Sequence, residues 1–205
     1  AGKTTLMNIL YGLHKPDRGE IRISGQPVKI TNPKVAINLG IGMVHQHFSL
    51  VRAFTALENI ILGDEPVRSG VIDYRTAKKN VLETCEKYNL HVDLNSKVEN
   101  LSVSSQQKVE ILKALYRGVR ILILDEPTSV LAPQEAEGLF TMLRRLTSQG
   151  TCVILISHKL PEVMTYSDRI TILRQGRSIA TVETKAASAD ELTSLMVGSD
   201  SKIQN

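Results

Sequence analysis

The stretch ILILDEPT, residues 121–128, decides the fold of this chain. Four consecutive bulky apolar residues predict a strand that is buried on both faces, as in a parallel sheet. Asp125 and Glu126 follow at the carboxyl end of that strand, where open α/β sheets place their ligands. On an extended backbone the two carboxylates point to opposite sides, so that one can hold a metal ion while the other addresses a second atom. A helix start or a turn, broken at Pro127, is the alternative interpretation.

The composition excludes several classes of protein. A chain of 205 residues with 42% hydrophobic and 22% charged residues is ordinary for one globular domain with an inserted lobe. No run approaches the ~20 apolar residues of a membrane helix. The net charge of +4 does not argue for nucleic-acid binding. Cys85 and Cys152 have no metal-like spacing, and we expect two reduced thiols of a cytosolic protein. No signal peptide is visible, although Ala1 is not a natural start and a preceding segment is expected.

Strand and helix signals alternate on both sides of a mostly helical region, residues 50–100. The sequence therefore predicts an α/β fold with a mainly parallel sheet, small antiparallel hairpins and an inserted helical subdomain. The expected strands are 20–24 and 28–30 as a hairpin, 40–44, 121–124, 152–156, and a hairpin over 169–182 that turns at Gln175-Gly176. The expected helices cover 6–10, 56–62, 74–88 and 134–148, and a further helix carries Val109, Leu112 and Tyr116 on one face. A surface loop is expected at 64–70 and a frayed tail at 199–205.

The chain opens on Gly2-Lys3-Thr4-Thr5 at a predicted helix start, which matches the end of the phosphate-binding loop G-x-x-x-x-G-K-[ST]. In such a loop the glycine lets N–H groups approach phosphate oxygens, the helix dipole favours the anion, and the lysine reaches the β and γ phosphates. Gly-Lys-Thr is common by chance, and the first glycine of the motif is not in this chain. However, Asp125 would face the Thr4 hydroxyl across a Mg²⁺ ion, and both halves together predict nucleotide binding.

Two further polar residues follow predicted strands. Gln46 comes after strand 40–44, and His158 comes two residues after strand 152–156. Glu126 is the candidate that orients or deprotonates an attacking water, His158 is a candidate γ-phosphate contact, and Gln46 can touch both the magnesium and that water. A structural histidine and a surface-loop glutamine are the alternative interpretations.

Three such strand ends at one phosphate site resemble the ATP-binding cassette (ABC) family of P-loop ATPases. The segment LSVSSQQ, residues 101–107, stands where that family has its LSGGQ signature, which serves the nucleotide of the opposite cassette. The resemblance implies that Gln46 is the Q-loop glutamine, Asp125 and Glu126 the Walker B pair, and His158 the switch histidine. It implies ATP and Mg²⁺ as cofactors. The implied site residues are Glu126, His158 and Gln46 for catalysis, Gly2, Lys3, Thr4, Thr5, Ser102, Ser104 and Gln106 for the nucleotide, and Thr4, Gln46 and Asp125 for the metal.

The segments 42–48, 109–118 and 125–135 are similar to those of importers of simple sugars and nucleosides, whose ATPase subunits carry two cassettes in one polypeptide. The chain resembles the first cassette, with the nucleoside type closest and ribose or galactose types as alternatives. The resemblance implies one amino-terminally truncated ABC domain, with a catalytic core at 1–47 and 111–205 and a helical subdomain at 48–110. It also implies a second cassette and a membrane permease as partners, a solute-binding lipoprotein indirectly, no nucleic acid, and a peripheral position on the cytoplasmic face of the membrane.

Three positions depart from the family pattern. Ser104 replaces the second glycine of the signature, Ser105 replaces the usual Gln or Glu, and Ala132 stands where many cassettes have an aspartate. All three face the partner cassette, so we expect one competent nucleotide site and one weakened site. Two alternative functions remain: a non-hydrolysing module in which ATP only joins two cassettes, and a non-transport ABC protein acting on ribosomes or DNA.

Overall fold

Three parallel strands form the central sheet of the computed structural model, which describes residues 2–198. β6 (Ile121–Asp125) lies between β3 (Ile41–Val44) and β7 (Cys152–Ile156), and Ile121 pairs with both Ile41 and Cys152. All four residues of β3 are buried, and so are four of the five residues of β6. The predicted buried strand at 121–124 and its parallel neighbours are therefore confirmed.

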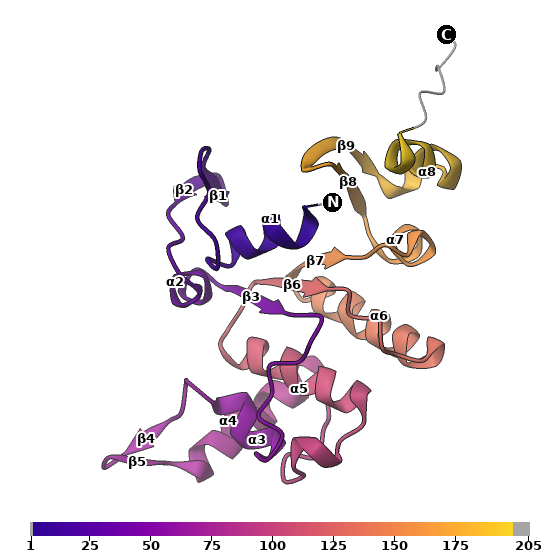
Figure 1. Ribbon diagram of the computed structural model, residues 1–205. Helices are drawn as coiled ribbons and strands as arrows, with labels where there is room; N and C mark the ends of the chain where they lie inside the picture. The colour runs from indigo at the N-terminus through magenta and orange to yellow at the C-terminus, as the bar shows by residue number, and fades with distance from the viewer. Residues whose placement is uncertain (1, 199–205) are drawn as a thin grey trace.

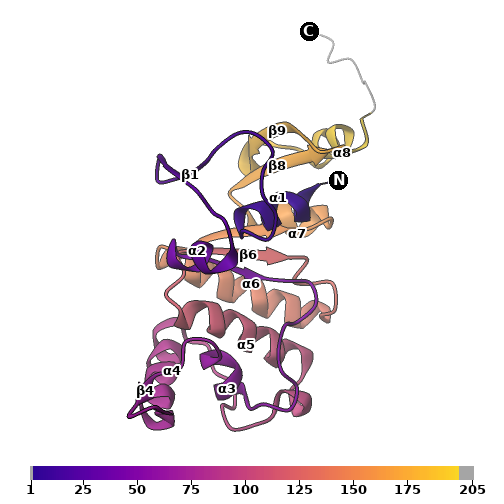
Figure 2. The same ribbon diagram turned by 60° about the vertical axis from the view of Figure 1, so that its left-hand side comes forward.

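Alternate residues of β6 pack into two different cores, which explains why the strand shows no polar residue before Asp125. Leu122 and Leu124 pack against the helices below the sheet, whereas Ile123 packs against those above it. The lower layer holds α5 (Val103–Tyr116) and α6 (Pro133–Ser148), and the upper layer holds α1 (Lys3–Leu10) and α2 (Pro33–Asn38) (Figures 1 and 2). A strand covered on both faces by helices is typical of parallel sheets.

The inserted helical region lies beneath the sheet. It contains α3 (Ala56–Ile61), α4 (Tyr74–Tyr88), the short helix η1 (Val98–Asn100) and α5. α3 and α4 both pack against α5, which in turn contacts β3, so α5 joins the helical region to the sheet (Figure 2). Within residues 2–198, no helix has both the length and the apolar character needed to cross a membrane.

Antiparallel hairpins flank the central sheet. β1 (Ile21–Ile23) pairs with β2 (Gln26–Val28), and β8 (Arg169–Arg174) pairs with β9 (Arg177–Glu183) across the predicted turn at Gln175-Gly176. The loop predicted at 64–70 is wrong in part, because β4 (Val67–Arg68) and β5 (Val71–Ile72) form a third hairpin. Ser69 and Gly70 between them both have positive φ angles, 53° and 81°, as a two-residue hairpin turn requires.

Within residues 2–198, five helical segments were not predicted: α2, η1, α7 (Leu160–Tyr166), the short helix η2 (Thr184–Ala186) and α8 (Ala189–Val197). α2 has a local signal, since the Asn32 side chain accepts a hydrogen bond from Val35 N and Pro33 occupies the first turn. Its six residues are too few to show a helical repeat in the sequence. The predicted tail at 199–205 lies outside the described residues.

Candidate functional site

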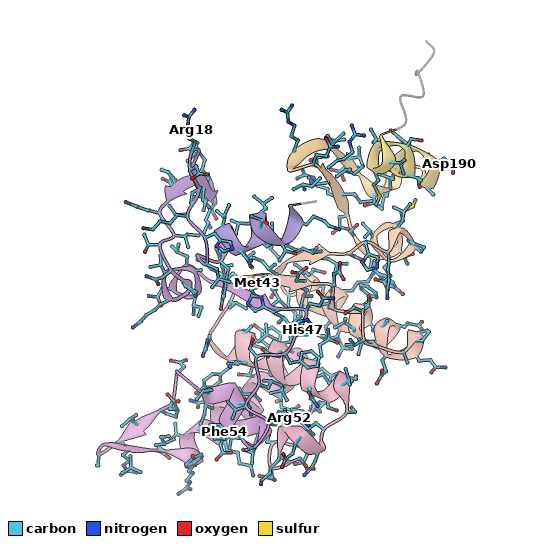
Figure 3. The ribbon with its side chains drawn as sticks, in the orientation of Figure 1. Arg18, Met43, His47, Arg52, Phe54 and Asp190 are labelled. Carbon is cyan, nitrogen blue, oxygen red and sulfur yellow. The ribbon has the colours of Figure 1, made fainter. Side chains whose placement is uncertain are left out.

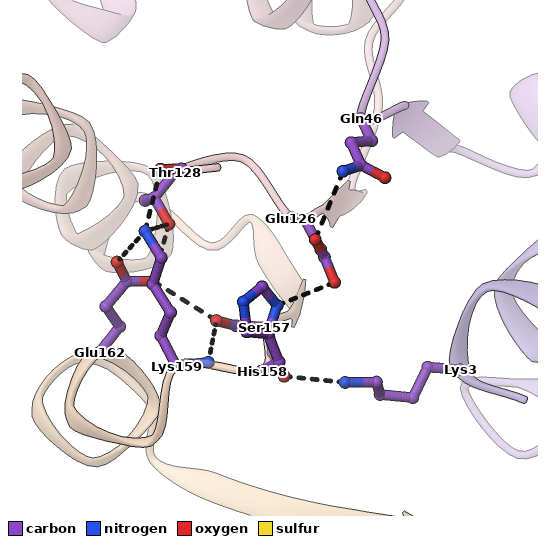
Figure 4. A network of polar contacts seen from close by, with 8 residues as sticks. All are labelled: Lys3, Gln46, Glu126, Thr128, Ser157, His158, Lys159 and Glu162. Carbon is purple, nitrogen blue, oxygen red and sulfur yellow. Dashed lines mark hydrogen bonds and ion pairs between the residues drawn. The ribbon is translucent and has the colours of Figure 1, made fainter. Parts of the chain in front are cut away.

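The ends of β3, β6 and β7 bring three predicted residues into contact. Glu126 lies at the centre: Gln46 Nε2 donates to its Oε2 at 3.4 Å, and His158 Nδ1 lies 3.0 Å from its Oε1 (Figure 4). Glu126 keeps 26% of its side chain exposed and His158 keeps 61%. Each carboxylate oxygen of Glu126 thus has a polar neighbour, while the group remains accessible to water.

The backbone at Glu126 differs from the sequence expectation. The residue has φ 47°, in the left-handed region, so Asp125 and Glu126 do not continue one extended strand and the argument from alternating sides does not hold. Asp125 still belongs to β6 and is 6% exposed. The chain turns at Glu126 because its N–H donates to Ile156 O at 2.9 Å, and its carbonyl then accepts from Ser129 N at 3.1 Å. Glu126 is therefore aimed by a backbone conformation that few non-glycine residues adopt.

The amino-terminal end of α1 points to the same place. Gly2 precedes the helix with φ 89°, and Lys3 Nζ donates to Ser157 O at 3.0 Å, beside His158 (Figure 4). Thr4 and Thr5 lie exposed in the first turn. The first N–H groups of a helix have no partner inside it and favour an anion, so this end is suited to phosphate.

The predicted signature residues form a separate group. Ser102 caps α5, and its Oγ accepts from Ser105 N at 3.2 Å. Gln106 Nε2 donates to Leu101 O at 2.9 Å, and Ser104 lies in the first turn of α5. Between residues 2 and 198, no hydrogen bond joins 102–106 to the group around Glu126.

A third group was missed from the sequence. Thr128, only 2% exposed, donates its hydroxyl to Glu162 Oε2 at 2.8 Å. Lys159 Nζ reaches Thr128 O at 3.0 Å and Glu162 Oε1 at 3.2 Å, and Ser157 Oγ lies 3.4 Å from Glu162 Oε2 (Figure 4). This network ties the segment after β6 to the segment after β7. Lys159 and Glu162 are three residues apart at the start of α7, a spacing that pairs side chains only on a helix. Because α7 was not predicted, their ion pair was not predicted either.

The predicted metal ligands fit the chemistry of Mg²⁺. Thr4 offers a hydroxyl, Gln46 an amide oxygen and Asp125 a carboxylate, and hard cations prefer such oxygen donors. Across residues 2–198, no group of three His, Cys, Asp or Glu side chains would hold a metal by itself. Mg²⁺ commonly completes its shell with water and substrate phosphate instead, which is consistent with this sparse set.

The segment after Gln46 runs down to the helical region. Figure 3 shows His47 just beyond β3, and Arg52 and Phe54 lower, beside α3. Phe54 is 40% exposed. Beneath this segment the nearly buried Glu110 of α5 accepts a hydrogen bond from Ser49 N at 2.5 Å. Burial raises the pKa of the Glu110 carboxyl, and that hydrogen bond opposes the shift. Electrostatic interactions with Lys113, His45 and Arg117 also oppose it.

A phosphate-suited helix start beside three parallel strand ends, with a carboxylate, a glutamine and a histidine in contact, defines a nucleotide-binding cassette of the P-loop type. The chain belongs to the ABC transporter family, which matches residues 1–129.

Among curated proteins, the chain is similar to the nucleoside import ATP-binding protein NupA of Lactococcus lactis subsp. cremoris, with 52% identity over 97% of this chain. It is 50% identical to the guanosine import ATP-binding protein NupO of Bacillus subtilis, again over 97% of its length. The chain spans 39% of the length of each of these two relatives.

Solved structures show the same fold. An ATP-binding cassette of an ABC transporter in its ADP conformation superposes with a TM-score of 0.77 over 96% of this chain and 80% of that one, at 23% identity. A dimeric cassette in a post-hydrolysis state, bound to ADP and Pi, gives a TM-score of 0.71 at 27% identity, over 89% and 81% of the two chains. The predicted α/β P-loop fold is thereby confirmed.

Proposed function

We propose that this protein binds and hydrolyses ATP to power the import of nucleosides or simple sugars through an ABC permease. The contact of Gln46 and His158 with Glu126 at three strand ends carries the proposal. The similarity to NupA, at 52% identity, supports a nucleoside as the cargo.

In this proposal Lys3 and the N–H groups of α1 bind the phosphates. Glu126 accepts the proton of the attacking water as the bond from water oxygen to γ-phosphorus forms and the bond to the β,γ-bridging oxygen breaks. His158 and Gln46 hold Glu126 before the reaction and orient the γ-phosphate and the water. Thr4, Gln46 and Asp125 would hold Mg²⁺, which neutralises charge on the phosphates when bound.

The remaining proposals concern assembly. Residues 1–47 and 111–205 form the catalytic core, and residues 48–110 form the helical subdomain. This subdomain docks on the permease together with the segment after Gln46. A second cassette of the same polypeptide contributes its own signature to the site at Lys3 and Glu126. In return, residues 102–106 complete the partner's site, which the change at Ser104 weakens. The protein then acts peripherally at the cytoplasmic face of the membrane, with a solute-binding lipoprotein outside.

The test is Glu126→Gln in the full-length protein. Removal of a general base typically lowers the rate by about 10²–10⁴-fold, so ATP hydrolysis should fall by about that factor at the competent site while ATP binding is retained. Lys3→Ala should instead weaken ATP binding itself, because it removes the cation beside the phosphates.

Glu83→Gln is the matched control, since this glutamate lies on α4 with 65% of its side chain exposed. It should leave both hydrolysis and binding at wild-type levels. ATPase activity that persists near wild type in Glu126→Gln would show that the assignment is wrong. If cells carrying Glu126→Gln lose uptake of a radiolabelled nucleoside but keep uptake of ribose, the cargo is a nucleoside.

A further inference from the structure

α5 carries two nearly buried polar side chains on the face that it turns towards the sheet. Gln107 is 3% exposed and Glu110 is 7% exposed. Polar groups at this level of burial require hydrogen-bond partners. Because the two residues are three positions apart, they lie on the same side of the helix.

Gln107 contacts the segment that aims Glu126. Its Nε2 donates to Pro127 O at 2.8 Å. A left-handed non-glycine residue persists only where the surrounding structure holds it. Two hydrogen bonds hold the backbone on either side of Glu126. Its own N–H donates to Ile156 O, and the carbonyl of the following residue, Pro127, accepts from Gln107.

Glu110 makes the equivalent contact to the other loop of the site. Its carboxylate accepts from Ser49 N at 2.5 Å, three residues after Gln46. The helix therefore reaches, through adjacent turns, the loops that carry Gln46 and Glu126.

The amino-terminal end of the same helix is Ser102, which caps it. Between the two ends α5 is anchored by three fully buried apolar side chains, Val109, Ile111 and Leu112. Close-packed interiors transmit strain, so a displacement of this 14-residue helix at Ser102 would reach Gln107 and Glu110.

We propose that Gln107 and Glu110 are positioning residues, through which α5 ties the surface at 102–106 to the reaction centre of the same chain. Since residues 102–106 meet the partner's nucleotide under the proposed function, on which this inference rests, engagement of one site repositions Glu126 and Gln46 at the other. Neither residue is among the predicted nucleotide contacts.

The first experiment is Gln107→Met in the full-length protein, which keeps the length of the side chain and removes its donor. Two amides report on the loop, because Glu126 N and Ser129 N are both hydrogen-bonded in the structure. Their hydrogen exchange should accelerate by about tenfold, in keeping with the loss of one buried hydrogen bond. In the β8–β9 hairpin, exchange should not change.

The kinetic readout separates positioning from folding. Misplacement of a reacting group costs up to about 10²-fold, so kcat should fall by about 10- to 100-fold. KM for ATP should stay within about twofold, since substrate binding does not use Gln107. Gln149→Met is the control: this glutamine also donates to a backbone carbonyl, Lys87 O at 3.1 Å, at the far end of α6. It should change neither kcat nor exchange at Glu126.

Glu110 gives a second, independent pair of variants. Glu110→Gln keeps an oxygen that accepts from Ser49 N. Its kcat and the hydrogen exchange of the Ser49 amide should therefore stay at wild-type values. Glu110→Met removes the acceptor, and should accelerate exchange at Ser49 and lower kcat by about tenfold.

The outcomes discriminate between the proposals. Unchanged exchange at Glu126 and Ser129 in Gln107→Met overturns the positioning role, whether or not the protein hydrolyses ATP. Accelerated exchange with an unchanged kcat also overturns it, because Gln107 is then only structural. Accelerated exchange in a protein whose wild type does not hydrolyse ATP shows that Gln107 holds the Glu126 loop and refutes the proposed function instead.

Discussion

Thr128→Val tests the network that joins the segments after β6 and β7. Valine has nearly the shape of threonine, so the change removes the hydroxyl of a residue that is 2% exposed and leaves little cavity. The lost interactions are the 2.8 Å bond to Glu162 Oε2 and the 3.2 Å contact from Lys159 Nζ.

The loss of stability in Thr128→Val depends on the interactions that Glu162 and Lys159 keep. A hydrogen bond to a charged group contributes about 1.5–3 kcal/mol to stability. Glu162 keeps its 3.2 Å pair with Lys159, and these two side chains are 18% and 39% exposed, so solvent screens part of the loss. We expect the free energy of unfolding to fall by about 1–2 kcal/mol.

Urea denaturation, followed by far-ultraviolet circular dichroism, measures this difference. Thr165→Val is the matched control, because the Thr165 hydroxyl is exposed and donates only to Pro161 O in its own helix. Its effect should stay within about 0.5 kcal/mol. If Thr128→Val destabilises no more than this control, the network does not hold the two segments together.

Two further predictions concern stability. Burial raises the pKa of Glu110 above the ordinary 4.5, so its ionisation opposes folding and the native state loses stability as pH rises above that ordinary value. Glu110→Gln should therefore gain stability relative to wild type as pH rises above 4.5 in urea titrations, and a constant difference would contradict the cause. Gly42→Ala should destabilise by about 1–3 kcal/mol, because the new Cβ would lie 2.8 Å from Val119 Cγ1 in the buried strand β3. Gly138→Ala, where the added Cβ meets nothing within 4 Å inside α6, should stabilise by about 0.5–1 kcal/mol. Urea denaturation measures both variants, and equal signs would refute the packing argument.

The parts of the fold that the sequence predicted are those in which a local pattern and the tertiary structure agree. The run at 121–124 is apolar on both faces because helices cover both faces of β6, and a sequence pattern records that burial directly. The hairpin of β8 and β9 was readable because Gln175-Gly176 supplies the turn. Short elements such as α2 and β4–β5 carry too few residues to show a period, and they depend on caps and turns.

The contacts of the site were predicted less completely. Lys3, Gln46, Glu126 and His158 are polar residues at a helix start or after apolar strands, and that position alone brings them near one another. Thr128 and Gln107 instead act through distant partners, over 34 and 20 residues of sequence respectively. No spacing rule connects such pairs, because they meet only after the sheet and α5 are assembled.

The left-handed backbone at Glu126 also affects how variants of this protein would be selected. Glycine adopts φ near 47° without the steric cost of about 1–2 kcal/mol that an L side chain incurs there. Selection for heat resistance alone would therefore favour glycine at the one position where the proposed base is required. Thermostability and turnover are opposed at this residue, so stabilising libraries for this protein should leave codon 126 unchanged.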